Sequence, residues 1–383
     1  MRFLFITFLL IFTLCFSSNF VRAQKIDTAI LKIADLKVIH SKLLNQDRKI
    51  FIYKPKTDIY PETPLPVLYM MDGESIAMVA GIVDFSINNG DFPPMIIVGI
   101  ANYEDERIND LSPVHLTTNQ YFTTSKSGGG ELFLKFVKDE VIPFVNKEYK
   151  TSKEKILFGH SLGGLMSAYS LLMYPELFNS YVSVSPSIWW ENNFLLQKAD
   201  SLFKIKSYKN KNIFICDGTE DPNHIVVRKF DSLLQKNKQS GLEHKYLTYD
   251  NETHNSQLVK ATQDGIRFIV DKWKPAKTDT TVEMVIKFYE NRSIQSGLKE
   301  LPPEQLINTI GYICLSIPDK IDEAVKFFQL NVKNYPNSFN VFDSLGDAFV
   351  AKKDKVKAIT AYKKAILLNP KSVETINKLK ALD

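Results

Sequence analysis

The sequence predicts an α/β protein, with a mostly parallel sheet covered by helices on both faces and a small all-α region after it. Three observations predict this arrangement. From residue 38 to about residue 273, short apolar runs alternate with segments of helical periodicity. The runs are apolar throughout, as in strands buried on both faces of a parallel sheet. After Trp273 comes the polar stretch KPAKTDTT, and everything beyond it has helical spacing.

The elements of the first region follow in chain order. Residues 38–53 alternate in the manner of two antiparallel strands. Further strands are predicted at the apolar runs 65–73, 94–100, 155–159, 180–185 and 211–218. Helices are predicted at 130–148, 162–173 and near 193–204.

The all-α region contains a 34-residue period, in which Ala324, Phe328 and Pro336 recur as Ala358, Tyr362 and Pro370. This period predicts two tetratricopeptide (TPR) repeats, at about 305–338 and 339–372, of which the first is degenerate. Because about three repeats are needed for independent stability, we expect this segment to pack on the first region. A generic helical hairpin is the alternative.

The first 23 residues have the pattern of a secretory signal. One Arg precedes an almost unbroken apolar run from Phe3 to Phe16, and a small residue, Ala23, offers a cleavage site. Since the run is shorter than the roughly 20 residues of a spanning helix, we expect cleavage rather than a retained anchor. The predicted domains are therefore a signal peptide at 1–23, an α/β domain at 24–275 and a helical region at 276–383. The mature protein is expected in the periplasm or outside the cell, without a membrane segment.

Composition narrows the class of partner. The formal net charge is +5, and the predicted signal peptide holds two of the arginines, so the remaining charge is too mild for binding nucleic acid. Cys216 and Cys314 fall in different predicted domains, and no disulfide is expected between them. Histidines, cysteines and carboxylates do not cluster at ligand spacings, and no Gly-rich phosphate loop follows a strand. Neither a metal nor a cofactor is expected.

Residues 155–173 combine a strand, the turn Gly-His-Ser-Leu-Gly and a helix. This is the context of a nucleophile elbow, and it predicts the α/β-hydrolase fold with Ser161 as the nucleophile. Glycines are expected at 159 and 163 because the two backbones approach closely, so that a side chain at either position would clash. The positive end of the following helix favours a developing oxyanion. A tight turn without catalysis is the alternative.

The base and the acid follow the nucleophile along the chain in this fold. His254 lies on a polar loop just before the last helix of the region, and we expect it to be the general base. His224 is the competitor, and His160 is expected to face the opposite way on the elbow. His40 and His244 are expected to be structural.

The acid is expected in the loop after the strand at 211–218. Asp221 is favoured because the following Pro222 restricts the loop and can hold the carboxylate toward the imidazole. Glu220 is the main rival. Asp217 is nearest the strand end, where it can simply cap the turn.

Two backbone N–H groups are expected to bind the oxyanion. One belongs to Leu162, directly after the nucleophile. The second is expected from the loop MMDGES, where Gly73 permits an unusual backbone geometry and Glu74 supplies the N–H. An ordinary Asp-Gly turn is the alternative.

Several segments together resemble the Putative esterase family of α/β hydrolases. They are PVLYMMDGE, IIVGIAN, FVKDEVIPFVNKEY, GHSLGGLMSAYSLLMYPELFNSYVSVSPSIWW and the late His254. The family includes siderophore esterases, feruloyl and acetylxylan esterases, S-formylglutathione hydrolase and the mycolyltransferases. The resemblance covers residues 38 to about 273, is nearest to the siderophore-esterase branch, and implies a hydrolase that uses Ser161 and His254. Some members of that branch use only a Ser-His pair, so the role of Asp221 stays open.

Other residues are candidates for the substrate pocket. Trp189 and Trp190 follow a strand and are expected to form an apolar wall, with core packing as the alternative. His115 is a further candidate for contact with substrate. The resemblance implies that Arg107 braces its loop through Asp110.

The function predicted from these observations is a secreted or periplasmic serine esterase that acts on a small-molecule or oligosaccharide ester. Siderophore trilactones and acylated carbohydrates are the alternative substrates, and an acyltransferase differs only in which nucleophile takes the acyl group. A hypothesis of another class is an inactive hydrolase-fold scaffold that binds a protein partner through its TPR repeats.

Overall fold

The computed structural model describes residues 32–55, 64–102, 104–117, 126–273, 280–296 and 299–382. The predicted signal peptide lies outside these residues. Within the described ranges, no helix has both the length and the apolar character needed to cross a membrane.

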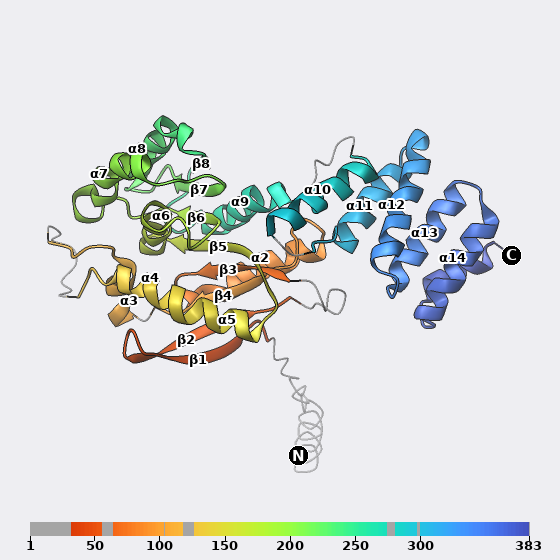
Figure 1. The fold of residues 1–383 in the computed structure, drawn as a ribbon, viewed down its shortest axis with the longest axis horizontal. Helices are drawn as coiled ribbons and strands as arrows, with labels where there is room; N and C mark the ends of the chain where they lie inside the picture. The colour runs from red at the N-terminus through yellow and green to blue at the C-terminus, as the bar shows by residue number, and fades with distance from the viewer. Residues whose placement is uncertain are drawn as a thin grey trace, which may run out of the picture. The chain divides into compact units, whose positions relative to one another are not determined.

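The described part of the α/β region contains one eight-stranded sheet, with strands in the order β1-β2-β4-β3-β5-β6-β7-β8. The strands are β1 (Asp35–Ser41), β2 (Gln46–Tyr53), β3 (Leu65–Met70), β4 (Ile96–Ile100), β5 (Thr151–His160), β6 (Ser180–Val184), β7 (Lys211–Gly218) and β8 (Leu242–Tyr249). Strand β2 is antiparallel to β1 and β4, and the other neighbours are parallel. The predicted mostly parallel sheet is therefore confirmed (Figure 1).

The central strands contribute to a hydrophobic core on each face of the sheet, because successive side chains of a strand point to opposite sides. In β3, Val67 and Tyr69 belong to one hydrophobic core, while Leu68 and Met70 belong to another. The first core includes residues of α4 (Gly130–Phe136), α5 (Ile142–Glu148), α6 (Leu162–Met173), α7 (Trp190–Ile205) and α8 (His224–Lys236). The second includes residues of α2 (Ile76–Asn88) and α9 (Leu258–Val270). The short helix α3 (Glu104–Leu111) follows β4.

The helix predicted at 130–148 is continuous but contains a π-helical turn at Val137–Val141 between α4 and α5. Pro143 lies at the start of α5. Its ring removes one backbone N–H, so the usual pattern of helical hydrogen bonds cannot be kept there. The apolar spacing of the sequence carries no signal of this local widening.

The C-terminal helices have a core of their own. They are α10 (Val282–Ser296), α11 (Glu304–Leu315), α12 (Ile321–Asn334), α13 (Phe339–Ala351), α14 (Lys355–Leu368) and α15 (Val373–Lys380), and α11 to α14 pack in chain order (Figure 1). Gly311 lies against the ring of Phe328, and Gly346 lies in the same way against Tyr362. Two similar helical pairs therefore follow one another. Their identity as TPR repeats stays a prediction.

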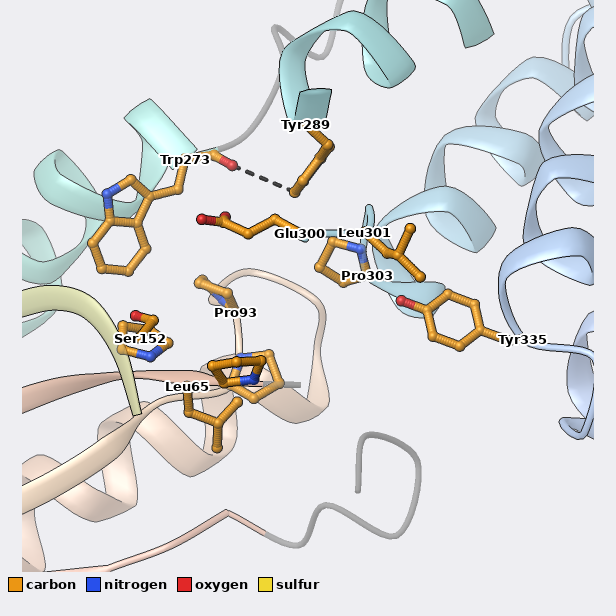
Figure 2. Close-up of a pocket in the computed structure, with 12 residues that line it drawn as sticks. Leu65, Pro93, Ser152, Trp273, Tyr289, Glu300, Leu301, Pro303 and Tyr335 are labelled. Carbon is orange, nitrogen blue, oxygen red and sulfur yellow. Dashed lines mark hydrogen bonds between the residues drawn. The ribbon is translucent and has the colours of Figure 1, made fainter. Parts of the chain in front are cut away.

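Residues of both regions line one small pocket of about 80 Å³ (Figure 2). Leu65, Pro93 and Trp273 come from the α/β region, and Leu301 and Tyr335 come from the helical region. The hydroxyl of Tyr289 donates a hydrogen bond to the backbone carbonyl of Trp273, with 3.4 Å between the oxygens. The helical segment thus contacts the α/β region in this part of the chain.

Candidate active site

Ser161 lies on a sharp turn between β5 and α6. Its φ of 60° and ψ of −117° place it outside the conformations that residues with side chains favour, which costs of the order of 1–3 kcal/mol. Three backbone hydrogen bonds hold the turn. The N–H of Ser161 donates to the carbonyl of Val184, and the carbonyl of Ser161 accepts from the N–H groups of Leu165 and Ser187. The strained conformation is therefore imposed by its surroundings.

The glycines of the elbow have different roles. A Cβ on Gly159 would lie 2.0 Å from the carbonyl oxygen of Gly163, so a side chain is excluded there as predicted. A Cβ on Gly163 would lie 3.1 Å from the Cβ of Met71, which is tight but is not a backbone collision. The more restricted neighbour is Gly164, whose Cβ would lie 2.9 Å from the carbonyl oxygen of Val184. The prediction of a clash at 163 was therefore too strong.

His254 and Asp221 form a hydrogen-bonded pair. The Nδ1 atom of His254 lies 2.9 Å from Oδ2 of Asp221, and Oδ1 of Asp221 accepts from the N–H of Asn223 at 2.9 Å. Because a carboxylate can only accept, Nδ1 of His254 carries the proton and Nε2 keeps a free electron pair. That is the tautomer a general base needs.

The electrostatic environment keeps Asp221 ionised. Burial alone would raise the pKa of its carboxyl, which is fully buried, but hydrogen bonds from His254 and from the N–H of Asn223 lower that pKa below its usual value. The rival acid Glu220 is exposed, and its backbone N–H donates to the carbonyl of Glu252. Of the two carboxylates, Asp221 is the one paired with the imidazole.

The structure brings His254 next to the elbow without a direct hydrogen bond to Ser161. Among the described residues, the hydroxyl of Ser161 has a hydrogen-bond contact of 3.5 Å with the hydroxyl of Ser187. The ring of His160 lies beside that of His254, with 4.7 Å between their centroids. Hydrogen bonds of catalytic groups commonly tighten only when substrate binds. Direct proton transfer between Ser161 and His254 therefore requires one of the two side chains to move.

The sequence predicts that the side chain of His160 faces away from the catalytic groups, and this prediction is wrong: the side chain contacts the loop that carries His254. Its Nε2 donates a hydrogen bond of 2.8 Å to the backbone carbonyl of His254. Burial lowers the pKa of His160 to about 4, so the ring is neutral near neutral pH. Because Nε2 is occupied by the loop that carries His254, the role that the geometry supports for His160 is to position that loop.

The other histidines lie apart from this pair. Nδ1 of His224 lies 3.6 Å from Oδ2 of the buried Asp217, which also accepts from the hydroxyl of Tyr246. His40 pairs with Asp47, and His244 pairs with Asp231. The competitor His224 therefore faces Asp217 rather than the elbow.

The loop predicted to supply the second oxyanion N–H lies against the elbow, but its unusual residue is not the glycine. Asp72 has a left-handed backbone with φ of 55°, and the 3-10 turn η1 (Gly73–Ser75) carries Glu74. Gly73 is needed because its Cβ would lie 2.3 Å from the backbone of Gly99. Glycine is thus required at position 73 because two backbones approach closely there. It is not required for a positive φ. Leu162 begins α6, where helix geometry leaves its N–H without an intrahelical partner.

A polar network holds this loop in place. Arg107 forms two hydrogen bonds with the carboxylate of Asp72, at 2.6 and 2.9 Å, whereas Asp110 forms two with the buried Arg48. Asn102 joins the two pairs, because its amide oxygen accepts from the N–H of Asp72 and its amide nitrogen donates to Asp110. The expected pairing of Arg107 with Asp110 is therefore wrong. Asp110 accepts instead from Arg48 and Asn102, and Arg107 binds the carboxylate of Asp72 in the oxyanion loop.

The three residues predicted to line the substrate pocket, Trp189, Trp190 and His115, differ in how deeply they are buried. Trp190 is 1% exposed and donates through Nε1 to the carbonyl of Val114, so it belongs to the core and not to a substrate wall. Trp189 is half-buried against the ring of Trp190. His115 is exposed, with Nδ1 2.8 Å from the hydroxyl of Ser127. Trp189 therefore keeps its place as a candidate, and nothing in the contacts of His115 links it to Ser161.

A cavity of about 490 Å³ lies beside the elbow. Its lining includes Asp72, Glu74, Arg107 and His160, together with apolar side chains such as Met78. Residues on the oxyanion loop and on the elbow thus share one open space. In the described residues, no group of histidines, cysteines and carboxylates has the arrangement of a metal site.

Sequence reasoning did not find three residues of this site. Ser187 contacts the nucleophile, and the fully buried Ser185 and Gln257 form a hydrogen bond close to the loop that carries His254. The stretch SPSIWW drew attention for its tryptophans rather than its serines. Gln257 follows His254 in a polar loop and has no signal that distinguishes it from an exposed residue.

Comparisons with known proteins identify the family of the chain. The model of a family described as "Putative esterase" matches residues 41–269. The ferri-bacillibactin esterase BesA of Bacillus subtilis is 28% identical over 265 residues, which is 61% of this chain and 88% of that protein. An IroE-like serine hydrolase from Shewanella oneidensis has a similar fold, with a TM-score of 0.67 at 24% identity, over 77% of this chain and 98% of that one.

A second solved structure is similar over more of the chain. An uncharacterised protein from Capnocytophaga ochracea has a TM-score of 0.58 at 17% identity and covers 91% of this chain and 99% of its own. That coverage is more than the α/β region alone can supply. The likeness shows that an α/β region followed by helices recurs in another protein.

Proposed function

Because the chain belongs to the Putative esterase family and is an ester hydrolase, we propose that it is a serine hydrolase that works through an acyl-enzyme. The observation that carries the proposal is the pairing of Asp221 with Nδ1 of His254 beside a strained Ser161. Ser161 is the proposed nucleophile, His254 the general base, and Asp221 the group that holds the imidazole in the required tautomer.

The proposed reaction has two steps. The hydroxyl oxygen of Ser161 bonds to the ester carbonyl carbon while its proton passes to Nε2 of His254. The resulting oxyanion accepts hydrogen bonds from the N–H groups of Leu162 and Glu74. The bond from carbon to the alcohol oxygen then breaks, and the leaving alkoxide takes the proton from His254. Water attacks the acyl-enzyme by the same route and releases the acid.

For the substrate, we propose a siderophore ester. Relatives named as esterases of siderophores include the ferri-bacillibactin esterase, a triacetylfusarinine C esterase of Aspergillus fumigatus and an iron(III) salmochelin esterase of Escherichia coli. Acylated carbohydrates remain the second substrate class, since Trp189 offers an aromatic face for either. We also propose secretion through residues 1–23.

The test uses the mature chain, p-nitrophenyl acetate and a fluorophosphonate probe. Wild type is expected to turn over the ester and to take the label, and Ser161→Ala is expected to lose at least about 10³-fold in kcat/KM and all of the label. Ser167→Ala is a matched control, because it removes a buried hydroxyl of α6 that bonds to the carbonyl of Leu157. Equal rates in wild type and Ser161→Ala would refute the mechanism. A panel of trilactone siderophores and acylated oligosaccharides, read by mass spectrometry, then decides the substrate class.

A further inference from the structure

The cavity of about 490 Å³ beside the elbow has its charged residues on the side of β3 and β4. Asp72 and Glu74 follow β3, and Arg107 lies on α3, which follows β4. Strand β5 leads to Ser161 and lies between β3 and β6, and the strands that precede the proposed acid and base, β7 and β8, lie beyond β6. Because the base gives its proton to the leaving alcohol, we expect the alcohol on the side of the base and the acyl group toward the cavity.

This cavity carries more negative than positive charge. Among its described lining residues, Asp72 and Glu74 are carboxylates and Arg107 is the cation. Arg107 forms two hydrogen bonds with Asp72, at 2.6 and 2.9 Å, so these two charges offset each other. His160 adds no charge near neutral pH, because burial lowers its pKa to about 4. Two carboxylates and one guanidinium therefore leave one negative charge, which belongs to Glu74.

The side chain of Glu74 is exposed to the open space of the cavity. Its carboxylate accepts a long hydrogen bond of 3.4 Å from the backbone N–H of Asn102, which is a neutral group. Among the described lysines and arginines, none forms an ion pair with Glu74. Since the N–H of this same residue is the proposed oxyanion donor, its carboxylate lies close to the group that is attached to the reacting carbonyl carbon.

We propose that the carboxylate of Glu74 makes the enzyme selective for esters whose acyl group is uncharged or cationic. The inference rests on the proposed function. An anionic acyl group would meet a like charge in the cavity, whereas apolar side chains such as Met78 and Phe158 suit an uncharged chain. Arg107 can bind an anion only after it breaks its two hydrogen bonds to Asp72. Among siderophore esters, the cavity favours one whose acyl part carries no negative charge.

The experiment compares p-nitrophenyl esters whose acyl chains have the same number of carbons before the charged group. They are the neutral hexanoate, the anionic hydrogen adipate and the cationic 6-(trimethylammonio)hexanoate. For wild type at low salt, kcat/KM for the adipate is expected to lie about tenfold below that for the hexanoate, and the cationic ester is expected to match or exceed the hexanoate. Because salt screens exposed charges, the difference between the neutral and anionic esters is expected to shrink at about 0.5 M salt.

Two variants are expected to change the ratio of neutral to anionic kcat/KM in opposite directions. Glu74→Gln keeps the backbone N–H and removes the charge, so the ratio is expected to fall to about threefold or less. Arg107→Gln leaves Asp72 without its cation, so the ratio is expected to rise to about 30-fold. Glu176→Gln is the control, because it removes an exposed carboxylate near the amino end of β6, whereas the elbow follows the carboxyl end of β5. Its ratio is expected to match wild type.

The ratio compares two esters on the same protein, so a variant that is slower or partly unfolded does not change it for that reason alone. Thermal unfolding of each variant is measured beside it. A ratio that falls in Glu74→Gln and rises in Arg107→Gln, with the control unchanged, supports the inference.

Four results would overturn the inference. Equal kcat/KM for the neutral and anionic esters shows that wild type has no selectivity, and an equal loss with the cationic ester shows an apolar rather than an acidic cavity. A preference for the anionic ester that disappears in Arg107→Gln shows that Arg107 leaves Asp72 to bind the anion. A wild-type ratio in Glu74→Gln assigns the selectivity to another charge.

The proposed function fails separately. A wild-type chain that takes no fluorophosphonate label and hydrolyses none of the esters overturns the proposed function and the inference with it. A labelled chain that hydrolyses the three esters without discrimination overturns the inference alone.

Discussion

The α/β region and the helical region differ in how far along the chain their important contacts reach. The candidate active site joins the loop at 72–74, the elbow at Ser161 and the loops that carry Asp221 and His254. In the helical region, α11 to α14 each pack mainly on the next helix in the sequence. Substitutions of the proposed nucleophile, base and acid are therefore expected to change the reaction rate with little change in stability. Substitutions at the contacts between these helices are expected to change the stability of the protein and to leave the reaction rate per folded molecule unchanged.

The largest effect is expected from Asp221→Asn in the α/β region. An amide is nearly isosteric with the carboxylate, but it neither stabilises the imidazolium nor selects the required tautomer of His254. We expect kcat to fall about 10²–10⁴-fold while the thermal unfolding temperature stays close to that of wild type.

Glu220→Gln is the control for this change, because Glu220 is the exposed carboxylate of the same loop. Its activity is expected to match wild type. If Glu220→Gln lost more activity than Asp221→Asn, the acid would have to be reassigned. If neither lost activity, a Ser-His pair would be sufficient.

The pH dependence of stability is expected to come in part from His160. Its pKa falls from 6.5 to about 4 on folding because the ring is buried. Between these values the unfolded chain binds a proton that the folded chain does not, so the free energy of unfolding decreases as the pH drops. The decrease due to His160 is expected to reach about 3 kcal/mol near pH 4.

Urea denaturation of wild type and His160→Gln at pH 7 and pH 4.5 measures this contribution. Glutamine can still donate to the carbonyl of His254 but does not titrate, so the variant is expected to lose less stability on acidification. His40→Gln, which replaces an exposed histidine on β1, is measured beside it as a control for the loss of a histidine. Parallel curves for wild type and His160→Gln would show that the buried imidazole does not contribute.

The smallest effect is expected from Gly346→Ala in the helical region. The added Cβ would lie 2.3 Å from the ring of Tyr362, so α13 and α14 must separate, at a cost of about 1–3 kcal/mol. Gly81→Ala is the matched control in α2, where nothing lies within 4 Å, and it is expected to stabilise by about 0.5–1 kcal/mol. Thermal unfolding measures both. A loss of esterase activity per folded molecule in Gly346→Ala would break the contrast between the two regions.

The helices and strands could be predicted from the sequence more fully than the backbone geometry of the site. Strand runs, the main helices and the 34-residue period were readable because apolar spacing and glycine positions are local signals. The π turn at Val137–Val141 and the strained segment at Asp72 were not, since apolar spacing carries no signal of either. Gly73 was singled out for the wrong reason, because close approach to Gly99 is visible only when both strands are placed.

By itself, the sequence determined the alternation of strands and helices, the elbow around Ser161 and the short set of candidate acids and bases. Only the tertiary structure decided which charged groups pair. Arg107 pairs with Asp72 across 35 positions, and Arg48 pairs with Asp110 across 62. The physical reason is that an ion pair depends on which side chains the sheet brings together. Spacing along the chain reports only on neighbours within one or two helical turns.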